Sequence, residues 1–153
     1  MAKISAIALI EQAEQQVLSV RTTINMNDLA DVTGHVYGQI MAYLSQTGEY
    51  VADAPFVCYY NTDLNNLDVE IGFPVSRPLQ GSGEITARTI PVQRAITGLH
   101  LGSYRDSDPL YFEMMKWIKD NGYEAQGAVY NYYLNDLNRP ESELLTKIVI
   151  PVK

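Results

Sequence analysis

The stretch VYGQIMAYLSQTG at residues 36–48 recurs without a gap as LYFEMMKWIKDNG at residues 110–122, an offset of 74 residues (110 minus 36). Both copies place apolar residues at positions i, i+1, i+4, i+5 and i+8, which is the stripe of an amphipathic helix. Each copy ends in a glycine suited to a helix C-cap, Gly48 in the first and Gly122 in the second. The pair therefore predicts two equivalent helices and a duplicated half-domain.

The segments that follow the two helices repeat as well. FVCYYN at 56–61 aligns with YNYYLN at 130–135 at the same offset. EIGFPV at 70–75 aligns with KIVIPV at 147–152 after three inserted residues. Both pairs have the composition of β-strands, so two strands are predicted after each helix.

A further strand is predicted before each helix, over residues 17–24 in the first copy and 85–100 in the second. Each half thus has the order strand–helix–strand–strand, an SHS2-type duplication with repeats at about 17–75 and 85–152. At 153 residues the chain has the usual length of one domain, so residues 1–153 are expected to form a single α+β domain. We expect its duplicated units to form an antiparallel sheet with pseudo-two-fold symmetry and both helices on one side.

Composition and charge limit the class of protein. Hydrophobic residues make up 46% of the chain, and no run approaches the roughly 20 apolar residues of a membrane span. The net charge of −7 comes without a cluster of Lys and Arg, which argues against direct binding to nucleic acid. Cys58 is the single cysteine and the N-terminal stretch lacks the pattern of a signal peptide, so a cytoplasmic location is expected.

Several stretches together resemble the GyrI-like domains, the effector-binding domains of AraC-type and MerR-type multidrug regulators. They are SVRTTI at 19–24, VYGQIMAYL at 36–44, LDVEIGFPV at 67–75, LHLGSY at 99–104, YFEMMKWIKDNG at 111–122, YNYYLND at 130–136 and LLTKIVIPV at 144–152. The resemblance implies a groove between the two halves, lined by aromatic residues, that accepts bulky and often cationic organic molecules. The regulators carry a helix-turn-helix domain in front, for which this chain has no room. The resemblance therefore implies a stand-alone ligand-binding protein.

Two positions depart from the family pattern. The resemblance implies an acidic residue within an aromatic–Glu–x–Tyr pattern, where this chain has Asn131. It implies a second Glu before the last strand, where this chain has Lys147. An amide offers hydrogen bonds but no charge, and it cannot act as a general base. We therefore predict no catalytic residue here, and tighter binding of neutral or anionic aromatics than of quaternary cations.

Eight residues are candidates for contacting a ligand. Alternation along a strand places Asn131 and Tyr133 on one face and Tyr130 and Tyr132 on the other, and the first pair is assigned to the groove. For the aromatic candidates the alternative is packing in the core, and for Glu70 it is a solvated strand face. The full set is Tyr37, Tyr59, Glu70, Tyr104, Tyr111, Trp117, Asn131 and Tyr133.

No cofactor or metal site is predicted. His35 and His100 lie far apart in the sequence, and no Cys-rich or His-x-x-x-His spacing occurs. His100 and Tyr104 match the family's His-x-Gly-x-Tyr, and for His100 a hydrogen bond at a strand end is favoured over catalysis. The acidic stretch DLNRPESE at 136–143 is expected to be a solvated connection between strands.

Three functions stay open. The first is capture of a hydrophobic or aromatic small molecule, and the second is hydrolysis of such a molecule, as in some GyrI-like relatives. The third is binding to a protein partner, as implied by the relative that inhibits DNA gyrase. Asn131 favours binding over hydrolysis, because the amide lacks the base that hydrolysis requires. The sequence predicts neither the ligand nor the oligomeric state.

Overall fold

The computed structural model describes residues 4–135 and 138–153, apart from the side chain of Arg105. The predicted connection at 136–143 therefore lies partly outside the described residues. Its described end forms a short 3-10 helix, η3 (Glu141–Glu143).

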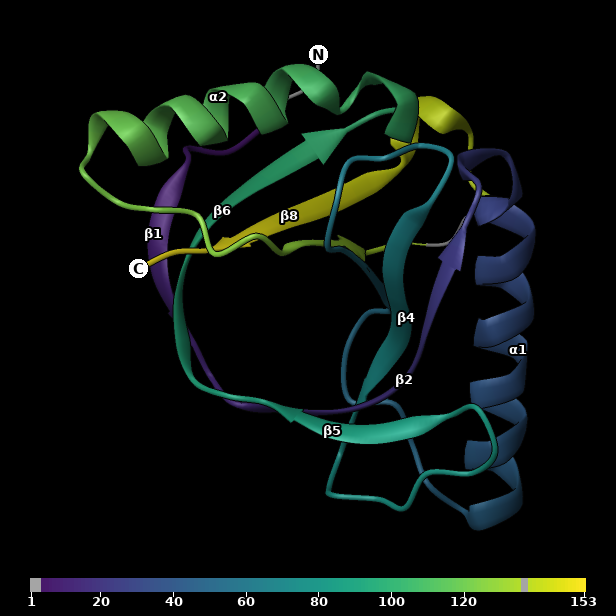
Figure 1. Cartoon of the computed structure of the whole chain (residues 1–153). Coiled ribbons are helices and arrows are strands. Elements are labelled where there is room, and N and C mark those ends of the chain that lie inside the picture. The colour runs from purple at the N-terminus through teal and green to yellow at the C-terminus, as the bar shows by residue number, and fades with distance from the viewer. Residues whose placement is uncertain (1–3, 136–137) are drawn as a thin grey trace. The chain divides into compact units, whose positions relative to one another are not determined.

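Helices α1 (Leu29–Thr47) and α2 (Asp108–Asp120) belong to two separate compact units of the chain (Figure 1). The α1 unit is Ala13–Val92. The α2 unit joins the N-terminal segment up to Gln12 to Gln93–Lys153. Among the described residues, neither helix is long and apolar enough to cross a membrane.

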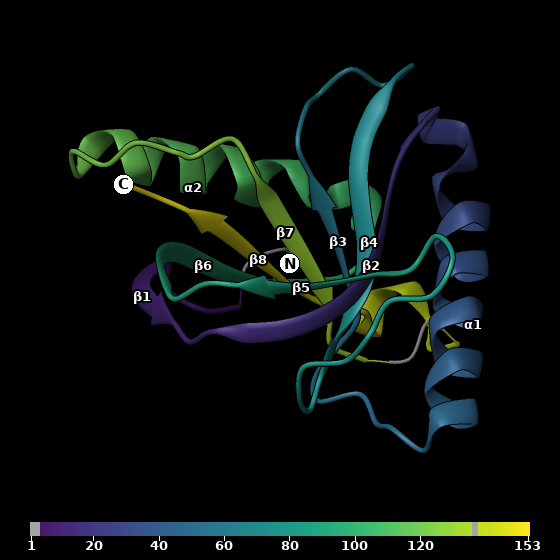
Figure 2. The same ribbon diagram turned by 60° about the horizontal axis from the view of Figure 1, so that its bottom comes forward.

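The strands of the α1 unit are antiparallel and follow the order β3-β4-β2-β5. Their bounds are β2 (Gln15–Ile24), β3 (Phe56–Tyr59), β4 (Leu67–Val75) and β5 (Thr86–Ile90). Helix α1 runs beside β2 and β4 (Figures 1 and 2). A one-turn 3-10 helix, η1 (Met26–Asp28), leads from β2 into α1.

The strands of the α2 unit are also antiparallel and follow the order β1-β6-β8-β7. Their bounds are β1 (Ala8–Gln12), β6 (Gln93–Leu101), β7 (Val129–Tyr133) and β8 (Leu145–Pro151). Helix α2 lies against β6 in this unit, and the 3-10 helix η2 (Tyr104–Asp106) leads into it.

The glycines predicted to end the helices do so. Gly48 follows α1 with a φ of 70°, and its N–H donates to the carbonyls of Leu44 and Ser45. Gly122 follows α2 with a φ of 78°. Such left-handed backbone is disfavoured for residues with a Cβ, so a glycine stops each helix at low cost.

In each unit the strands pack one face on the unit's own helix. In the α2 unit this helix face carries a core cluster, formed by Ile96, Leu110, Met114, Ile118, Ile148, Ile150 and Val152. In the α1 unit the ring of Phe73 in β4 lies 5.0 Å from the ring of Tyr37 in α1. Because side chains alternate along a strand, the residues between these positions point away from the helix. We call that side of the strands of each unit the opposite face.

The predicted α+β fold with antiparallel strands and two helices is confirmed. The prediction of one strand over 85–100 is wrong: β5 ends at Ile90 and β6 begins at Gln93. Pro91 stands at the break, where it has no N–H to continue a ladder. β5 pairs with β2 in the α1 unit. Strand β1 was not predicted, and a single domain over residues 1–153 stays a prediction.

Candidate functional site

Glu70 is a buried acid on the opposite face of β4. It is 2% exposed, and it lies three residues before Phe73, so it points away from α1. Its carboxylate accepts four hydrogen bonds. Oε1 accepts from the hydroxyl of Tyr60 at 2.6 Å and from Nη2 of Arg88 at 2.6 Å. Oε2 accepts from the hydroxyl of Ser19 at 2.6 Å and from Nε of Arg88 at 2.7 Å.

These donors come from three different strands or strand ends. Ser19 belongs to β2, Arg88 to β5, and Tyr60 directly follows β3. Burial alone would raise the pKa of Glu70, but the hydrogen bonds from Arg88, Ser19 and Tyr60 outweigh it and hold the pKa below the ordinary value. Glu70 is thus a buried, ionised and fully hydrogen-bonded carboxylate. A solvated strand face, the alternative left open by the sequence, is wrong for it.

A second ion pair borders this cluster. Arg21 donates to both carboxylate oxygens of Asp68, at 2.9 and 2.8 Å, and its guanidinium lies 3.8 Å from the ring centroid of Tyr60. The hydrogen bond from Arg21 lowers the pKa of Asp68. Here the arginine and aspartate side chains are 56% and 34% exposed, whereas those of Arg88 and Glu70 are 33% and 3% exposed. Tyr60 therefore stands between a surface ion pair and a buried one.

The opposite face of the α2 unit carries aromatic rings instead of an acid. Tyr130 and Tyr132 of β7 stack with their ring centroids 6.1 Å apart and an interplanar angle of 16°. The ammonium of Lys147 lies 5.1 Å from the centroid of Tyr132. Nε2 of Gln12 donates to the hydroxyl of Tyr132 at 3.4 Å. This face combines flat apolar surface with a cation and an amide.

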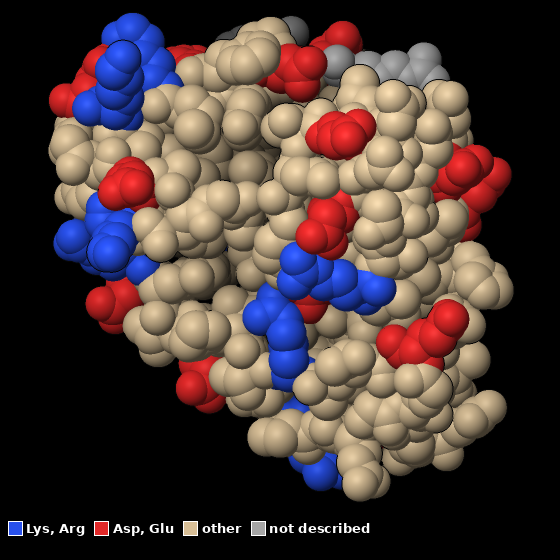
Figure 3. All heavy atoms as spheres, viewed as in Figure 1, with Lys and Arg blue, Asp and Glu red and all other residues tan. Residues whose placement is uncertain are grey.

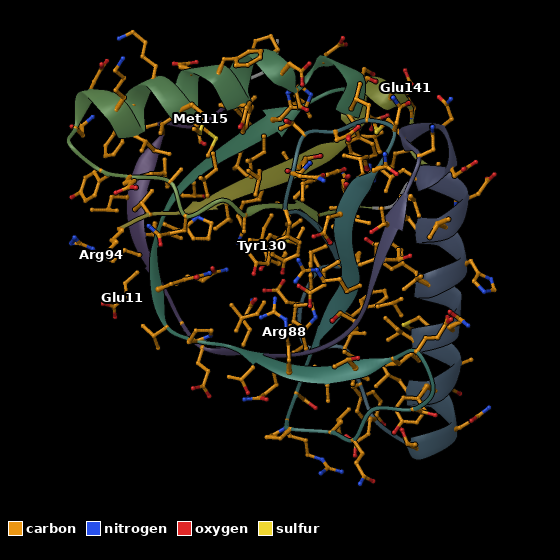
Figure 4. All side chains as sticks on the ribbon, viewed as in Figure 1. Glu11, Arg88, Arg94, Met115, Tyr130 and Glu141 are labelled. Atoms are coloured by element: carbon orange, nitrogen blue, oxygen red, sulfur yellow. The ribbon has the colours of Figure 1, made fainter. Side chains whose placement is uncertain are left out.

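A hollow of about 370 Å³ adjoins Tyr130 in the α2 unit. Its lining residues are Gln93, Arg94, Gln126, Ala128, Tyr130, Pro151, Val152 and Lys153. Figure 4 shows Tyr130 and Arg94, which come from β7 and from the start of β6. Arg94 also lies over the ring of Tyr123, with its Cζ 5.4 Å from the ring centroid. The charged side chains of this described lining, Arg94 and Lys153, are both basic.

Asn131 and Tyr133 lie on the helix face of β7. A Cβ on Gly98 would stand 3.3 Å from both Leu110 and Met114 of α2, so Gly98 faces the helix. Gly98 is opposite Ile148, which is opposite Asn131, so Asn131 also points toward α2. The predicted alternation of the two pairs is confirmed, and the face turned away from α2 carries Tyr130 and Tyr132.

The remaining aromatic candidates have close ring neighbours within their own units. The ring of Tyr104 lies 4.8 Å from that of Tyr133, so these two candidates are brought together. Tyr111 meets Phe112 edge to face at 5.6 Å. Trp117 stacks on Tyr123 at 6.1 Å.

In the α1 unit, two candidate tyrosines lie on the helix face. The hydroxyl of Tyr37 donates to the carbonyl of Phe56 at 3.1 Å. Tyr59 is opposite Val69, which shares the side of Phe73 in β4. Neither tyrosine is on the face that carries Glu70.

His100 forms the strand-end hydrogen bond favoured from the sequence. Its Nε2 lies 2.8 Å from the carbonyl of Ser103, and since a carbonyl accepts, Nε2 carries the proton. Nδ1 of His100, the hydroxyl of Tyr104 and the hydroxyl of Thr146 are buried and have no hydrogen-bond partner among the described residues. Burial raises the pKa of Tyr104.

Ser19, Tyr60 and Arg88 were not selected from the sequence. The period-2 pattern of β2 could have placed Ser19 beside Glu70 once the two strands were paired. Arg88 could not be found this way, because residues 85–100 were read as one strand of the second repeat. The pairing of β5 with β2 is what brings Arg88 to Glu70.

Two further observations concern the charges on the surface and the possible metal ligands. On the side shown in Figure 3, acidic and basic side chains are interspersed on a mostly uncharged surface. Within residues 4–135 and 138–153, no group of three or more His, Cys, Asp or Glu side chains could hold a metal ion.

Solved structures share this fold. EcmrR in its complex with DNA is similar, with 24% identity and a TM-score of 0.84, over 97% of this chain and 57% of EcmrR. This chain thus spans little more than half of that protein. The EcmrR C-terminal domain alone has 24% identity and a TM-score of 0.79, with 97% of each chain covered.

Two further relatives are more distant in sequence. A hydrolase encoded by lin2189 from Listeria innocua has 13% identity and a TM-score of 0.74, over 99% of this chain and 93% of the hydrolase. SAV2435, in a structure bound to tetraphenylphosphonium, has 13% identity and a TM-score of 0.67, over 97% of this chain and 94% of SAV2435. At these identities the likeness shows the fold.

The family is assigned from the sequence, by comparison with a family model. No curated protein matches it. The model of the GyrI-like small molecule binding domain matches residues 5–153, which is almost the whole chain. This chain therefore belongs to the family of GyrI-like small molecule binding domains.

Proposed function

We propose that this chain binds neutral or anionic aromatic compounds at the hollow beside Tyr130. The observation that carries the proposal is the lining of this hollow, which combines a tyrosine ring, three apolar residues and two basic side chains. Its volume of about 370 Å³ is within the range of pockets that bind small molecules. Tyr130 lines the hollow as a 5% exposed residue, and a tyrosine combines an apolar ring with a polar hydroxyl, which suits an aromatic guest.

The charges on the opposite face of the α1 unit and on that of the α2 unit support a neutral or anionic ligand. Arg94 and Lys153 at the hollow, and Lys147 beside Tyr132, attract an anionic group and repel a cation. The acid that could attract a cation, Glu70, is already paired with Arg88. SAV2435 binds tetraphenylphosphonium, a quaternary cation, so this preference would separate the two proteins.

A matched series of naphthalene derivatives tests the proposal by calorimetry. We expect 2-naphthoate and 2-naphthamide each to bind at least tenfold more tightly than (2-naphthyl)trimethylammonium. Tyr130→Leu should weaken binding of all three compounds, because it removes the ring at the hollow. Arg94→Gln should weaken binding of the naphthoate alone. Tyr50→Leu is the control, since Tyr50 is 75% exposed in the α1 unit and does not line the hollow.

Two results would contradict the proposal. One is tighter binding of the trimethylammonium compound than of the amide by tenfold or more, about 1.4 kcal/mol. The other is equal loss of naphthoate binding in Tyr130→Leu and Tyr50→Leu. Chromatography after incubation with 2-naphthamide alone separates binding from turnover, because a bound amide is recovered unchanged and hydrolysis would convert it to 2-naphthoate and ammonia.

A further inference from the structure

We propose that Glu70, Tyr60 and Ser19 form a receptor site for a planar guanidinium or amidinium group, and that Arg88 fills this site as a tethered guest. Arg88 is then the residue that keeps organic cations away from Glu70. The consequence for ligand choice rests on the proposed small-molecule binding, whereas the site itself rests on contacts within the α1 unit.

The geometry of the ion pair is that of two parallel hydrogen bonds. Nε of Arg88 lies 2.7 Å from Oε2 of Glu70, and Nη2 lies 2.6 Å from Oε1. This fork matches the edge of a guanidinium or an amidinium, both of which are flat and present two N–H groups side by side. A tetrahedral ammonium cannot form the same pair of bonds. The contacts thus select a shape as well as a charge.

Two donors other than Arg88 hold the receptor half of the pair, and Nη2 of Arg88 also donates to one of them, the hydroxyl of Tyr60, at 3.4 Å. The hydroxyl of Ser19 and the hydroxyl of Tyr60 each donate to one carboxylate oxygen of Glu70 at 2.6 Å. Ser19 is itself 2% exposed. These two bonds hold the carboxylate in one orientation, with its outer edge directed at the guanidinium. Removal of the arginine side chain therefore leaves an oriented carboxylate.

Burial differs sharply between receptor and guest. The side chain of Glu70 is 3% exposed, whereas that of Arg88 is 33% exposed. Arg88, which is labelled in Figure 4, reaches the carboxylate from β5. This strand stands at the end of the strand order of its unit. The guest thus enters from the solvent side and closes over a buried anion. A free compound can follow the same route once the arginine side chain is absent.

A buried carboxylate requires a cationic partner. Without one, the charge is expensive to keep out of water, because two hydroxyl donors stabilise the carboxylate but do not neutralise it. In the parent protein Arg88 supplies that partner intramolecularly, so a free cation must displace a group held at high local concentration. In a variant that lacks the arginine, a free amidinium restores both the charge and the two hydrogen bonds.

The test is chemical rescue of Arg88→Ala by benzamidinium, followed by calorimetry and thermal unfolding. We expect the variant to bind benzamidinium at least tenfold more tightly than the parent, and its Tm to rise with benzamidinium concentration. Benzamide, which has nearly the same shape but no charge, should do neither. Arg21→Ala makes the same change in net charge beside Asp68, whose side chain is 34% exposed, and should show no gain.

Two further measurements keep the outcome decisive. If Arg88→Ala does not fold alone, the proposal requires benzamidinium to restore folding, and failure to do so overturns it. The double variant Glu70→Gln/Arg88→Ala lacks both charges and should gain no affinity for benzamidinium, and a gain equal to that of Arg88→Ala overturns the assignment to Glu70. Binding of 2-naphthoate to Arg88→Ala is measured in parallel. If 2-naphthoate binds neither the parent nor Arg88→Ala, the proposed function is wrong, whereas the result of the benzamidinium rescue still stands.

Discussion

The two repeats hold opposite charges at equivalent positions. Glu70 in β4 aligns with Lys147 in β8, and Cys58 in β3 aligns with Tyr132 in β7. In the α1 unit the carboxylate is buried and paired with Arg88. In the α2 unit the ammonium lies over an aromatic ring. This backbone position therefore accepts either sign of charge, provided that a neighbouring strand supplies a matched partner.

The partners are not equal in strength. A buried ion pair with four hydrogen bonds to the acid leaves an uncompensated charge when one partner is lost. A cation over a ring contributes less, about 0.5–2 kcal/mol depending on exposure. The α1 unit should therefore depend on its charge far more than the α2 unit depends on Lys147.

The largest expected effect separates the two units directly. Arg88→Met should lower the free energy of unfolding by about 3 kcal/mol, because it strands the carboxylate of Glu70 away from water. Lys147→Met should lower it by less than about 1 kcal/mol, since only the contact with a ring is lost. Urea unfolding followed by circular dichroism measures both. Equal losses in the two variants would show that the two positions do not differ as described.

The double variant Glu70→Gln/Arg88→Met is the control for this comparison. It removes both charges and leaves no buried ion, so it should recover most of the stability lost in Arg88→Met. A double variant no more stable than Arg88→Met would mean that the loss comes from packing of the arginine stem rather than from the stranded charge.

Lowering the pH tests the contribution of Glu70 in the α1 unit, with a smaller expected effect on stability. The folded-state pKa of Glu70 lies below its ordinary value of 4.5, so the ionised form contributes stability that is complete above about pH 4.5. That contribution is lost as the pH falls through the lower, folded-state pKa. The parent should therefore lose more stability between pH 6 and pH 3 than Glu70→Gln/Arg88→Met does. Urea unfolding at several pH values measures the difference, and parallel pH profiles would contradict it.

Local pattern predicted the helices and most strands because their periodicity is strong. The repeated stripe gave α1 and α2, and alternation gave the two faces of β7. The strand pattern could not say which face α2 covers, since that depends on how the helix folds back onto the sheet. Asn131 points toward α2, and its contact with a ligand stays a prediction.

Arg88, the partner of Glu70, could not be predicted from the local sequence pattern for a different reason. Arg88 is 18 residues away in sequence, and its strand pairs with β2, not with the strand that follows it. Pro91 signals a break within 85–100, but the choice of partner strand is made by tertiary packing. Strand β1 was missed because only five residues, two of them exposed, carry its signal.

A last comparison concerns two buried hydroxyls, one in each unit. Ser19 is 2% exposed and donates to Glu70, whereas Thr146 is 1% exposed and its hydroxyl has no hydrogen-bond partner among the described residues. Ser19→Ala should cost about 1.5–3 kcal/mol, the range for a hydrogen bond to a charged group. Thr146→Val keeps the shape and removes a polar atom that gains nothing from burial, so the free energy of unfolding should stay equal or rise by up to about 1 kcal/mol.

Thermal and urea unfolding of the two single variants tests this last contrast, and Thr146→Ser is the matched control. Thr146→Ser keeps the hydroxyl but removes a methyl group, so it should be less stable than the parent by about 1 kcal/mol. A loss of 1 kcal/mol or more in Thr146→Val would show that this hydroxyl is hydrogen-bonded in solution, with a buried water as the simplest partner. The hydroxyl of Thr146 would then mark a hydrated site beside His100 and Tyr104. The two hydroxyls would differ in their partners, which are a water for Thr146 and a carboxylate for Ser19.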